Sequence, residues 1–167
     1  MTPAIEFLDK QDIKYRVLKY HPNADGPAGM DAASKLGLNP GQVLKTLIMA
    51  LEGKSGDTRL AVAIIPAATG LRLSALAKAA GVRRALMAEP AKAERATGYV
   101  VGGISPFGQR RALPTYLDRD AMAFHSIFVN GGRRGVMLEV DPADLQEACS
   151  ASVNDITRMT PPPRESR

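Results

Sequence analysis

The sequence predicts a mixed α/β (α+β) domain built on antiparallel strands. Residues 43–51 form an apolar run in which both alternating faces are hydrophobic, which is typical of a strand covered on both sides. A second apolar run, 59–66, follows the turn-forming segment 53–57, so the two runs are expected to pair as antiparallel neighbours. Two shorter runs, 126–129 and 136–140, flank a glycine-rich turn and predict a second hairpin.

The N-terminal part is predicted to contain a helix, a strand and a second short helix. The Thr-Pro pair at 2–3 resembles an N-cap followed by a first helical residue, and residues 13–20 then form an extended segment. Residues 21–27 are rich in turn formers. A short helix over 31–36 follows and ends at Gly37, a residue suited to a helix C-terminus.

The second half of the chain is also predicted to contain both helices and strands. Residues 74–80 predict a helix that ends at Gly81, and residues 82–87 a strand. A short helix is expected over 91–95. The Asp-Pro pair that opens 141–149 predicts the last helix.

The length and composition fit one folded domain. A chain of 167 residues buries about 70% of its unfolded surface in a single core, and 45% hydrophobic with 23% charged residues is ordinary for a globular protein. We therefore predict one domain over residues 1–158. Residues 159–167 include three consecutive prolines and little that can be buried, so we predict a disordered tail.

Cysteine and histidine usage restricts the chemistry. The single cysteine, Cys149, cannot form an internal disulfide and fits a reducing cytoplasm. His21 and His125 have no cysteine or serine partner at a recognisable spacing, which argues against a metal site and against a Ser/His/Asp or Cys/His catalytic set. No apolar run approaches the ~20 residues that span a bilayer, and no signal peptide is apparent. We expect a cytoplasmic protein without membrane insertion.

Lys45 is the one charged residue in the apolar run 43–51. A cation between two apolar faces costs free energy unless an acceptor or an anionic ligand compensates for it. This makes Lys45 a candidate site residue. The alternative is that Lys45 lies at a strand end and extends its ammonium to water.

A glycine-rich segment, 99–108, is the second candidate. Glycine lets the backbone approach a ligand closely, and the amides of Gly102 and Gly103 are suited to binding a carbonyl or a developing oxyanion. A purely structural turn is the alternative. Tyr20 is a third candidate, because its hydroxyl can orient a substrate, although a buried tyrosine usually serves packing and one hydrogen bond.

The charge pattern permits an anionic partner. The net charge is +5, and arginine pairs at 83–84, 110–111 and 133–134 lie near predicted turns or strand ends. Guanidinium groups there can contact phosphate or form a solvated surface. Aromatic residues make up only 5% of the chain and tryptophan is absent, so stacking on bases is not expected to dominate binding.

Three ordered motifs, at residues 38–47, 97–106 and 129–135, resemble the YbaK/EbsC family. The resemblance covers residues 1–158 and is closest to the YbaK branch, the freestanding bacterial Cys-tRNA(Pro) deacylases. These are similar to the editing domain inserted into many bacterial prolyl-tRNA synthetases. The resemblance implies a central, twisted, mainly antiparallel sheet surrounded by helices.

The resemblance also implies a site. The family's essential lysine corresponds to Lys45 and its pocket tyrosine to Tyr20, while its Gly-x-x-x-Pro motif falls on Gly102 to Pro106. The implied substrate-binding residues are Tyr20, Gly102, Gly103, Ile104, Ser105, Pro106, Asn130 and Gly131. The chain departs from the branch at Asn130, where serine is usual, and at Met137, where an acidic residue is usual.

The implied activity is hydrolysis of the ester in mischarged Cys-tRNA(Pro), assisted by the substrate's own thiol, with no metal or other cofactor. Deacylation of Ala-tRNA(Pro) or of another small mischarged residue by a water-dependent route is an alternative, because Asn130 and Met137 alter the pocket. A noncatalytic module that binds tRNA or prolyl-tRNA synthetase is another. The expected partners are proline tRNA and prolyl-tRNA synthetase; neither DNA nor a membrane is expected.

Overall fold

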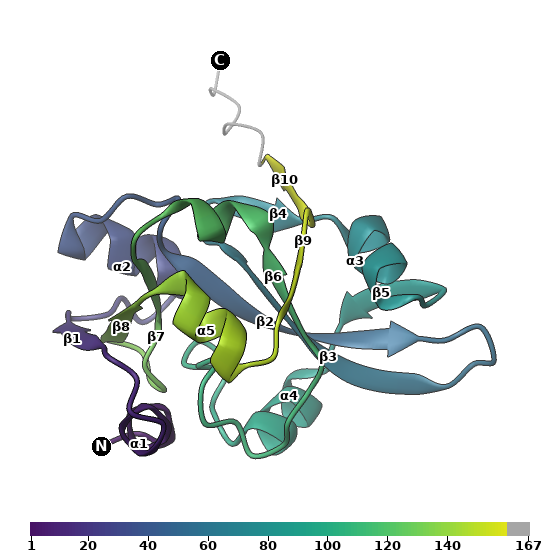
Figure 1. The fold of residues 1–167 in the computed structure, drawn as a ribbon, viewed down its shortest axis with the longest axis horizontal. Helices are drawn as coiled ribbons and strands as arrows, with labels where there is room; N and C mark the ends of the chain where they lie inside the picture. The colour runs from purple at the N-terminus through teal and green to yellow at the C-terminus, as the bar shows by residue number, and fades with distance from the viewer. Residues whose placement is uncertain (160–167) are drawn as a thin grey trace.

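A five-stranded sheet forms the centre of the molecule in the computed structural model, which describes residues 1–159 (Figure 1). Its strand order is β5-β2-β3-β6-β9. The strands are β2 (Leu44–Glu52), β3 (Thr58–Pro66), β5 (Arg84–Met87), β6 (Thr115–Asp118) and β9 (Ser152–Asn154). The expected antiparallel pairing of β2 with β3 is confirmed, in a register that runs from Leu44 opposite Pro66 to Glu52 opposite Thr58.

The other edge of this sheet was not predicted from the sequence. β6 pairs with β3, and β9 with β6, in parallel. These strands have four and three residues, too few to show a clear alternation of apolar and polar positions. Across all sheets of the described residues, five pairings are antiparallel and two are parallel, so the mainly antiparallel character is confirmed.

Two smaller sheets complete the strand set. One has the order β1-β8-β7, with β1 (Arg16–Lys19), β8 (Val136–Val140) and β7 (Ile127–Asn130), and contains the predicted second hairpin. The other pairs β4 (Thr69–Leu71) with β10 (Thr157–Met159). Met159, assigned to the tail from the sequence, is therefore the last residue of a strand. The rest of the predicted tail, 160–167, lies outside the described residues.

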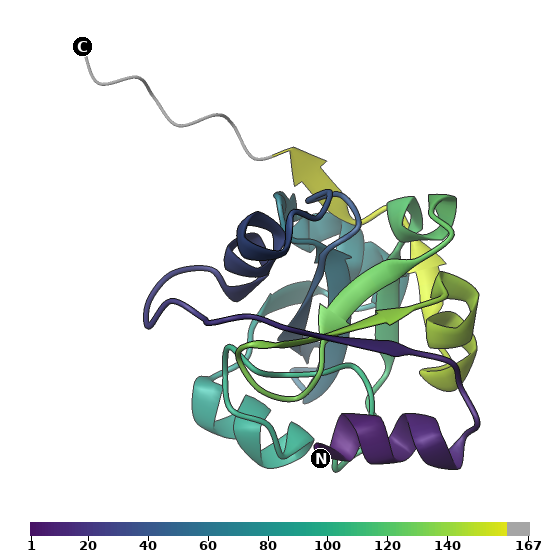
Figure 2. The same cartoon turned by 90° about the vertical axis from the view of Figure 1, so that its left-hand side faces the viewer.

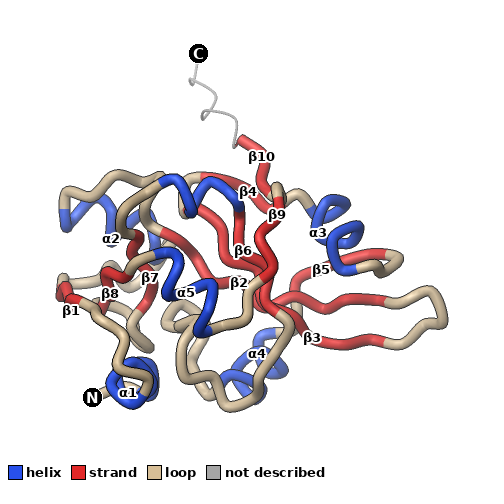
Figure 3. The backbone as a smooth tube through the Cα atoms, in the orientation of Figure 1, coloured by secondary structure: helices blue, strands red, loops and turns tan. Residues whose placement is uncertain are grey.

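The helices lie around the strands (Figure 3). They are α1 (Pro3–Lys10), α2 (Ala28–Leu36), α3 (Leu73–Ala80), α4 (Pro90–Thr97), α5 (Pro142–Ala148) and the 3-10 helix η1 (Arg119–Ala123). Thr2 caps α1 as predicted, since its hydroxyl accepts a hydrogen bond from the Ile5 amide at 3.3 Å. α2 starts three residues earlier than predicted and ends at Gly37, whose φ is 64°. No helix within residues 1–159 has the length and apolar character that crossing a membrane requires.

The central sheet is buried on both faces, as the sequence of residues 43–51 predicts. One face carries Leu44 and Ile48 into a core shared with α1, α5 and the β1-β8-β7 sheet. The other carries Met49 and Leu51 into a second core beneath α3. In the view of Figure 2, β1, β7 and β8 lie in front of the central sheet.

Candidate active site

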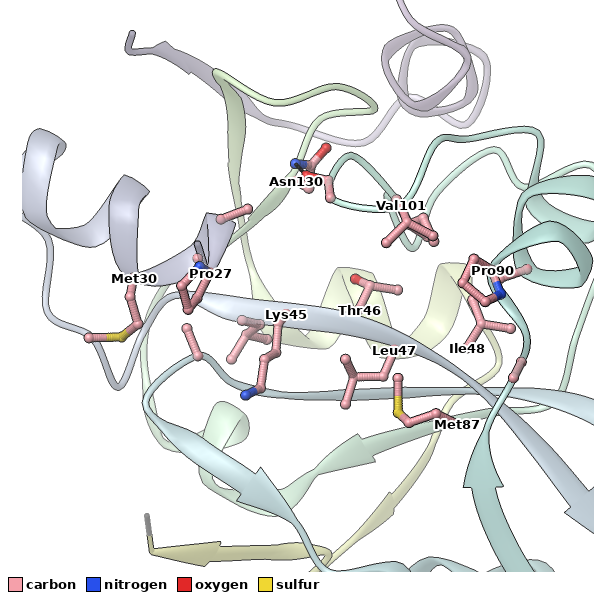
Figure 4. Close-up of a pocket in the computed structure, with 18 of the residues that line it drawn as sticks. Pro27, Met30, Lys45, Thr46, Leu47, Ile48, Met87, Pro90, Val101 and Asn130 are labelled. Carbon is pink, nitrogen blue, oxygen red and sulfur yellow. Dashed lines mark hydrogen bonds between the residues drawn. The ribbon is translucent and has the colours of Figure 1, made fainter. Parts of the chain in front are cut away.

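The strongest site candidate is a cavity of about 270 Å³ at the first half of β2 (Figure 4). Segments within 27–30, 44–48, 87–93 and 101–104 line it, together with Ala67, Asn130 and Met137. The lining is mostly apolar. In the described part of the chain, no carboxylate, imidazole or thiol belongs to this lining.

The cavity lies where the edge of β2 is open. β5 pairs with β2 only from Met49 onward, and an isolated bridge joins Val43 to Phe128. Between these two points, residues 44–47 have no strand partner on the side away from β3 within the described chain, and Ile48 closes the gap by accepting from the Ala88 amide. An open strand edge presents backbone N–H and C=O groups to a ligand.

Lys45 projects into the cavity from the second position of β2 (Figure 4). Its side chain is half-buried and its ammonium has no hydrogen bond or ion pair with residues 1–159. Burial alone lowers the pKa of Lys45 from its ordinary value. Lys45 therefore both lies near the start of a strand and remains an uncompensated cation, which is the arrangement that a negatively charged or strongly polar ligand group would stabilise.

Thr46 lies on the opposite face of β2, on the side of Val101 and Asn130 (Figure 4). Its hydroxyl oxygen is buried and has no hydrogen-bond partner, and it is the only side-chain nitrogen or oxygen in residues 1–159 of which this is true. Sequence reasoning missed Thr46. Its position next to Lys45 was the available signal, but the missing partner is visible only in the structure.

The glycine-rich segment contributes part of its length to the cavity. Gly102 and Ile104 line it, whereas Gly103 does not. The Gly103 amide donates to the Val100 carbonyl at 2.8 Å, so this N–H already has an acceptor within the protein, and its binding of a substrate carbonyl stays a prediction. Gly103 instead allows close packing, because a Cβ there would lie 2.8 Å from the Arg133 Cα.

Ser105 and Pro106 support the segment from behind. Both are buried and neither lines the cavity. The Ser105 hydroxyl accepts from the Phe107 amide at 3.2 Å, and the Pro106 carbonyl accepts from the Cys149 thiol at 3.5 Å. The structure thus gives these two residues a shaping role, and it places Cys149 against the core, as the sequence indicates.

Asn130 lines the cavity in a fixed orientation. Its Oδ1 accepts from the Gly132 amide at 2.7 Å, and its Nδ2 donates to the Gly102 carbonyl at 3.4 Å. Gly131 faces away from the cavity: its amide donates to Val136 and its carbonyl accepts from the Thr2 hydroxyl at 2.5 Å.

Tyr20 lies outside the cavity lining. Its hydroxyl donates to the Ala28 carbonyl at 3.4 Å, and Ala28 lines the cavity at the start of α2. Burial raises the pKa of Tyr20, which is consistent with a neutral hydroxyl. Tyr20 therefore holds the start of α2, which forms part of the cavity wall, in place.

The arginine pairs are partly structural. Arg83 and Arg84 both bind Glu52, and Arg134 donates to the carbonyls of Asn23 and Gly26 at 3.0 and 2.8 Å. No cluster of three His, Cys, Asp or Glu side chains in residues 1–159 is arranged to hold a metal ion.

The chain matches one family, described as the aminoacyl-tRNA editing domain, over residues 21–148. The chain belongs to this family. The editing domain is also 31% identical, over 156 residues, to EbsC of Enterococcus faecalis (strain ATCC 700802 / V583), a protein named for Cys-tRNA(Pro)/Cys-tRNA(Cys) deacylase activity. That alignment covers 93% of each chain. The YbaK/EbsC resemblance is thus confirmed, and with it the general activity of an aminoacyl-tRNA deacylase.

Solved structures show the same fold. The hypothetical protein APE2540 is 25% identical, with a TM-score of 0.80 over 93% of the editing domain and 99% of that chain. A protein described as a trans-editing enzyme for prolyl tRNA synthetase is 23% identical, with a TM-score of 0.77 over 93% and 95% of the two chains.

Proposed function

We propose that the editing domain hydrolyses the ester linking a mischarged cysteine to the terminal ribose of proline tRNA. Family membership supports deacylation of tRNA, and the name of the relative EbsC supports cysteine as the amino acid. Proline tRNA and prolyl-tRNA synthetase are the proposed partners. The cytoplasm is the proposed compartment.

One observation carries the proposed mechanism: Lys45 is the only ionisable side chain lining a mostly apolar cavity within the described chain. Among residues 1–159, no cysteine, serine or histidine lines the cavity to act as an enzyme nucleophile or base. The substrate thiol supplies the missing nucleophile. It attacks the ester carbonyl carbon, so that a C–S bond forms and the C–O bond to the ribose breaks.

In this step the ribose oxygen takes up the proton lost by the thiol. The resulting four-membered thiolactone is then opened by water, which returns free cysteine. In this proposal the cavity of about 270 Å³ holds the thiol close to the ester carbonyl, and such proximity accounts for much of the acceleration of an intramolecular reaction. Lys45 anchors the ester end or the terminal nucleotide, because a cation without an internal partner is stabilised by negative charge that develops there.

A second candidate substrate is Ala-tRNA(Pro), which would need a water-dependent route because alanine has no thiol. Met137, which is 2% exposed and lines the cavity, favours this reading. With Asn130 as the neighbouring polar group, this wall of the cavity is uncharged and suits a small apolar side chain.

The deciding experiment compares release of the amino acid from Cys-tRNA(Pro), Ala-tRNA(Pro) and Pro-tRNA(Pro) by the wild type and by Lys45→Ala. Lys54→Ala is the matched control, since Lys54 is exposed in the β2–β3 turn. Circular dichroism checks that each variant is folded. We expect the fastest release from Cys-tRNA(Pro), lost in Lys45→Ala and kept in Lys54→Ala.

Preferential release of alanine would retain the site and replace the substrate and mechanism. Full activity of a folded Lys45→Ala would remove Lys45 from the mechanism. No release from any mischarged tRNA would contradict the proposed function.

A further inference from the structure

The side chain of Thr46 has an unmet hydrogen-bonding capacity inside the cavity. Its Oγ1 is buried, and no residue from 1 to 159 provides a partner. Such an arrangement destabilises the free protein, because the hydroxyl has lost its water without gaining another bond. Valine has nearly the same shape and would fill this space without that loss.

Thr46 lies in the wall of the cavity. Thr46 lines the cavity beside Val101 and Asn130, and it lies on the stretch of β2 without a strand partner on one side (Figure 4). The Ile48 carbonyl on this edge accepts from Ala88 at 3.0 Å, so the backbone of Thr46, two residues away, faces the same open side. Thr46 therefore presents its hydroxyl and its backbone N–H and C=O groups at one point of the cavity wall.

The chemistry of the other lining groups indicates what Thr46 binds. An aminoacyl ester presents an α-amine, a donor that needs an acceptor. Lys45 has no acceptor atom, and the Oδ1 of Asn130 already accepts from Gly132. Asn130 Oδ1 retains one lone pair, whereas Thr46 Oγ1 has no hydrogen bond at all within residues 1–159. Because no carboxylate lines the cavity in that part of the chain, Thr46 Oγ1 is the lining side-chain acceptor with the largest unmet capacity.

We propose that Thr46 is a substrate-binding residue whose hydroxyl oxygen accepts a hydrogen bond from the α-amine of the aminoacyl group. This inference rests on the proposed deacylase function. It assigns a partner to the α-amine of the substrate, for which Lys45 has no acceptor atom. The two faces of β2 then divide the substrate: Lys45 binds near the ester or nucleotide, and Thr46 holds the amine.

The test pairs a change in the protein with a matched change in the substrate. Thr46→Val removes the hydroxyl and keeps the shape, and Thr46→Ser keeps the hydroxyl. Each is assayed on cysteinyl-tRNA(Pro) and on 3-mercaptopropionyl-tRNA(Pro), which retains the thiol and lacks only the amine. Thermal unfolding of each variant shows whether its fold is intact.

We expect Thr46→Val to lower kcat/KM on cysteinyl-tRNA(Pro) by about tenfold. On 3-mercaptopropionyl-tRNA(Pro) the same variant should match the wild type within about twofold. Thr46→Ser should remain close to the wild type on both. Thr46→Val should be at least as heat-stable as the wild type, because it removes an unpartnered buried hydroxyl.

An equal loss on both substrates would overturn the assignment, because it would place Thr46 at the ester or in a structural role. An unchanged Thr46→Val would overturn it as well. In both cases the active wild type would leave the proposed function standing. A wild type inactive on cysteinyl-tRNA(Pro) would overturn the proposed function and this assignment together.

Discussion

Lys45 carries a conflict between stability and function at the scale of a single residue. Its ammonium is half-buried in a mostly apolar cavity and has no partner among residues 1–159. Desolvating a cation in this way destabilises the folded state. A ligand with negative or developing negative charge relieves that destabilisation, so the feature that weakens the free protein favours binding and catalysis.

We predict that Lys45→Met raises the free energy of unfolding at pH 7 and lowers kcat/KM for deacylation by roughly 10- to 100-fold. Methionine keeps the length and apolar character of the side chain and removes the charge. Urea denaturation and a deacylation assay measure the two effects. Lys54→Met, in an exposed turn, should change neither.

The pH dependence of this difference follows from the direction of the pKa shift. Burial lowers the pKa of Lys45 in the folded state below its ordinary value of 10.5, so the unfolded state binds the proton more tightly. The wild type therefore gains stability as pH rises from the folded pKa of Lys45 toward 10.5. The advantage of Lys45→Met should narrow over that range, and an advantage that stays constant with pH would contradict the argument.

At the scale of elements, the cavity depends on how the 99–108 segment packs against the β7–β8 turn. Gly103 lies against the backbone of Arg133, and Asn130 at the end of β7 reaches the Gly102 carbonyl. The wall that carries Gly102 and Asn130 is therefore shared between two segments far apart in the sequence. Movement of either segment displaces lining residues of the cavity.

We predict that Gly103→Ala destabilises the protein by about 1–3 kcal/mol and lowers deacylation. The added Cβ would lie 2.8 Å from the Arg133 Cα, and backbone on both sides must shift to accept it. Chemical denaturation and the deacylation assay are the measurements.

Gly41→Ala is the matched control, because the nearest atom to its Cβ, 3.3 Å away, is the Asn39 side-chain oxygen. Gly41→Ala should have a much smaller effect than Gly103→Ala. Equal effects of the two substitutions would show that the contact between the 99–108 segment and the β7–β8 turn does not shape the cavity.

At the scale of the whole molecule, Asp118 connects the C-terminal part of the chain to the central sheet. Its carboxylate is 1% exposed, and it accepts from the Ile156 amide at 3.1 Å and from the Asp120 amide at 3.2 Å. Burial raises the pKa of Asp118, and these two amides partly oppose the effect. Ile156 in turn is fully buried beneath α3.

We predict that Asp118→Asn destabilises the protein by about 1–3 kcal/mol, because an amide side chain offers one acceptor to two N–H donors. The exposed Asp155 provides the comparison. It pairs with Arg72 and Arg119 at 3.9 and 3.5 Å, and Asp155→Asn should change stability by about 0.5 kcal/mol or less. Unfolding curves measure both; equal effects would show that Asp118 does not hold the C-terminal strands.

The parts of the fold that follow from local signals were predictable. The buried pair β2 and β3, the β7–β8 hairpin and the cap of α1 each depend on residues close together in sequence. β6 and β9 were not predictable, because strands of four and three residues have too little periodicity to be recognised. Their parallel pairing depends on long-range packing, which local patterns do not encode.

The candidate site was likewise only partly predictable from the sequence. By itself the sequence determined the editing-domain family and pointed to Lys45, Gly102, Ile104 and Asn130, all of which line the cavity. It also pointed to residues that prove to lie behind the lining: Tyr20, Gly103, Ser105, Pro106 and Gly131. Only the tertiary structure decided which were which and revealed the unpartnered hydroxyl of Thr46. The physical reason is that a motif fixes residue types and local conformation, whereas burial, open strand edges and missing hydrogen-bond partners depend on which distant segments pack together.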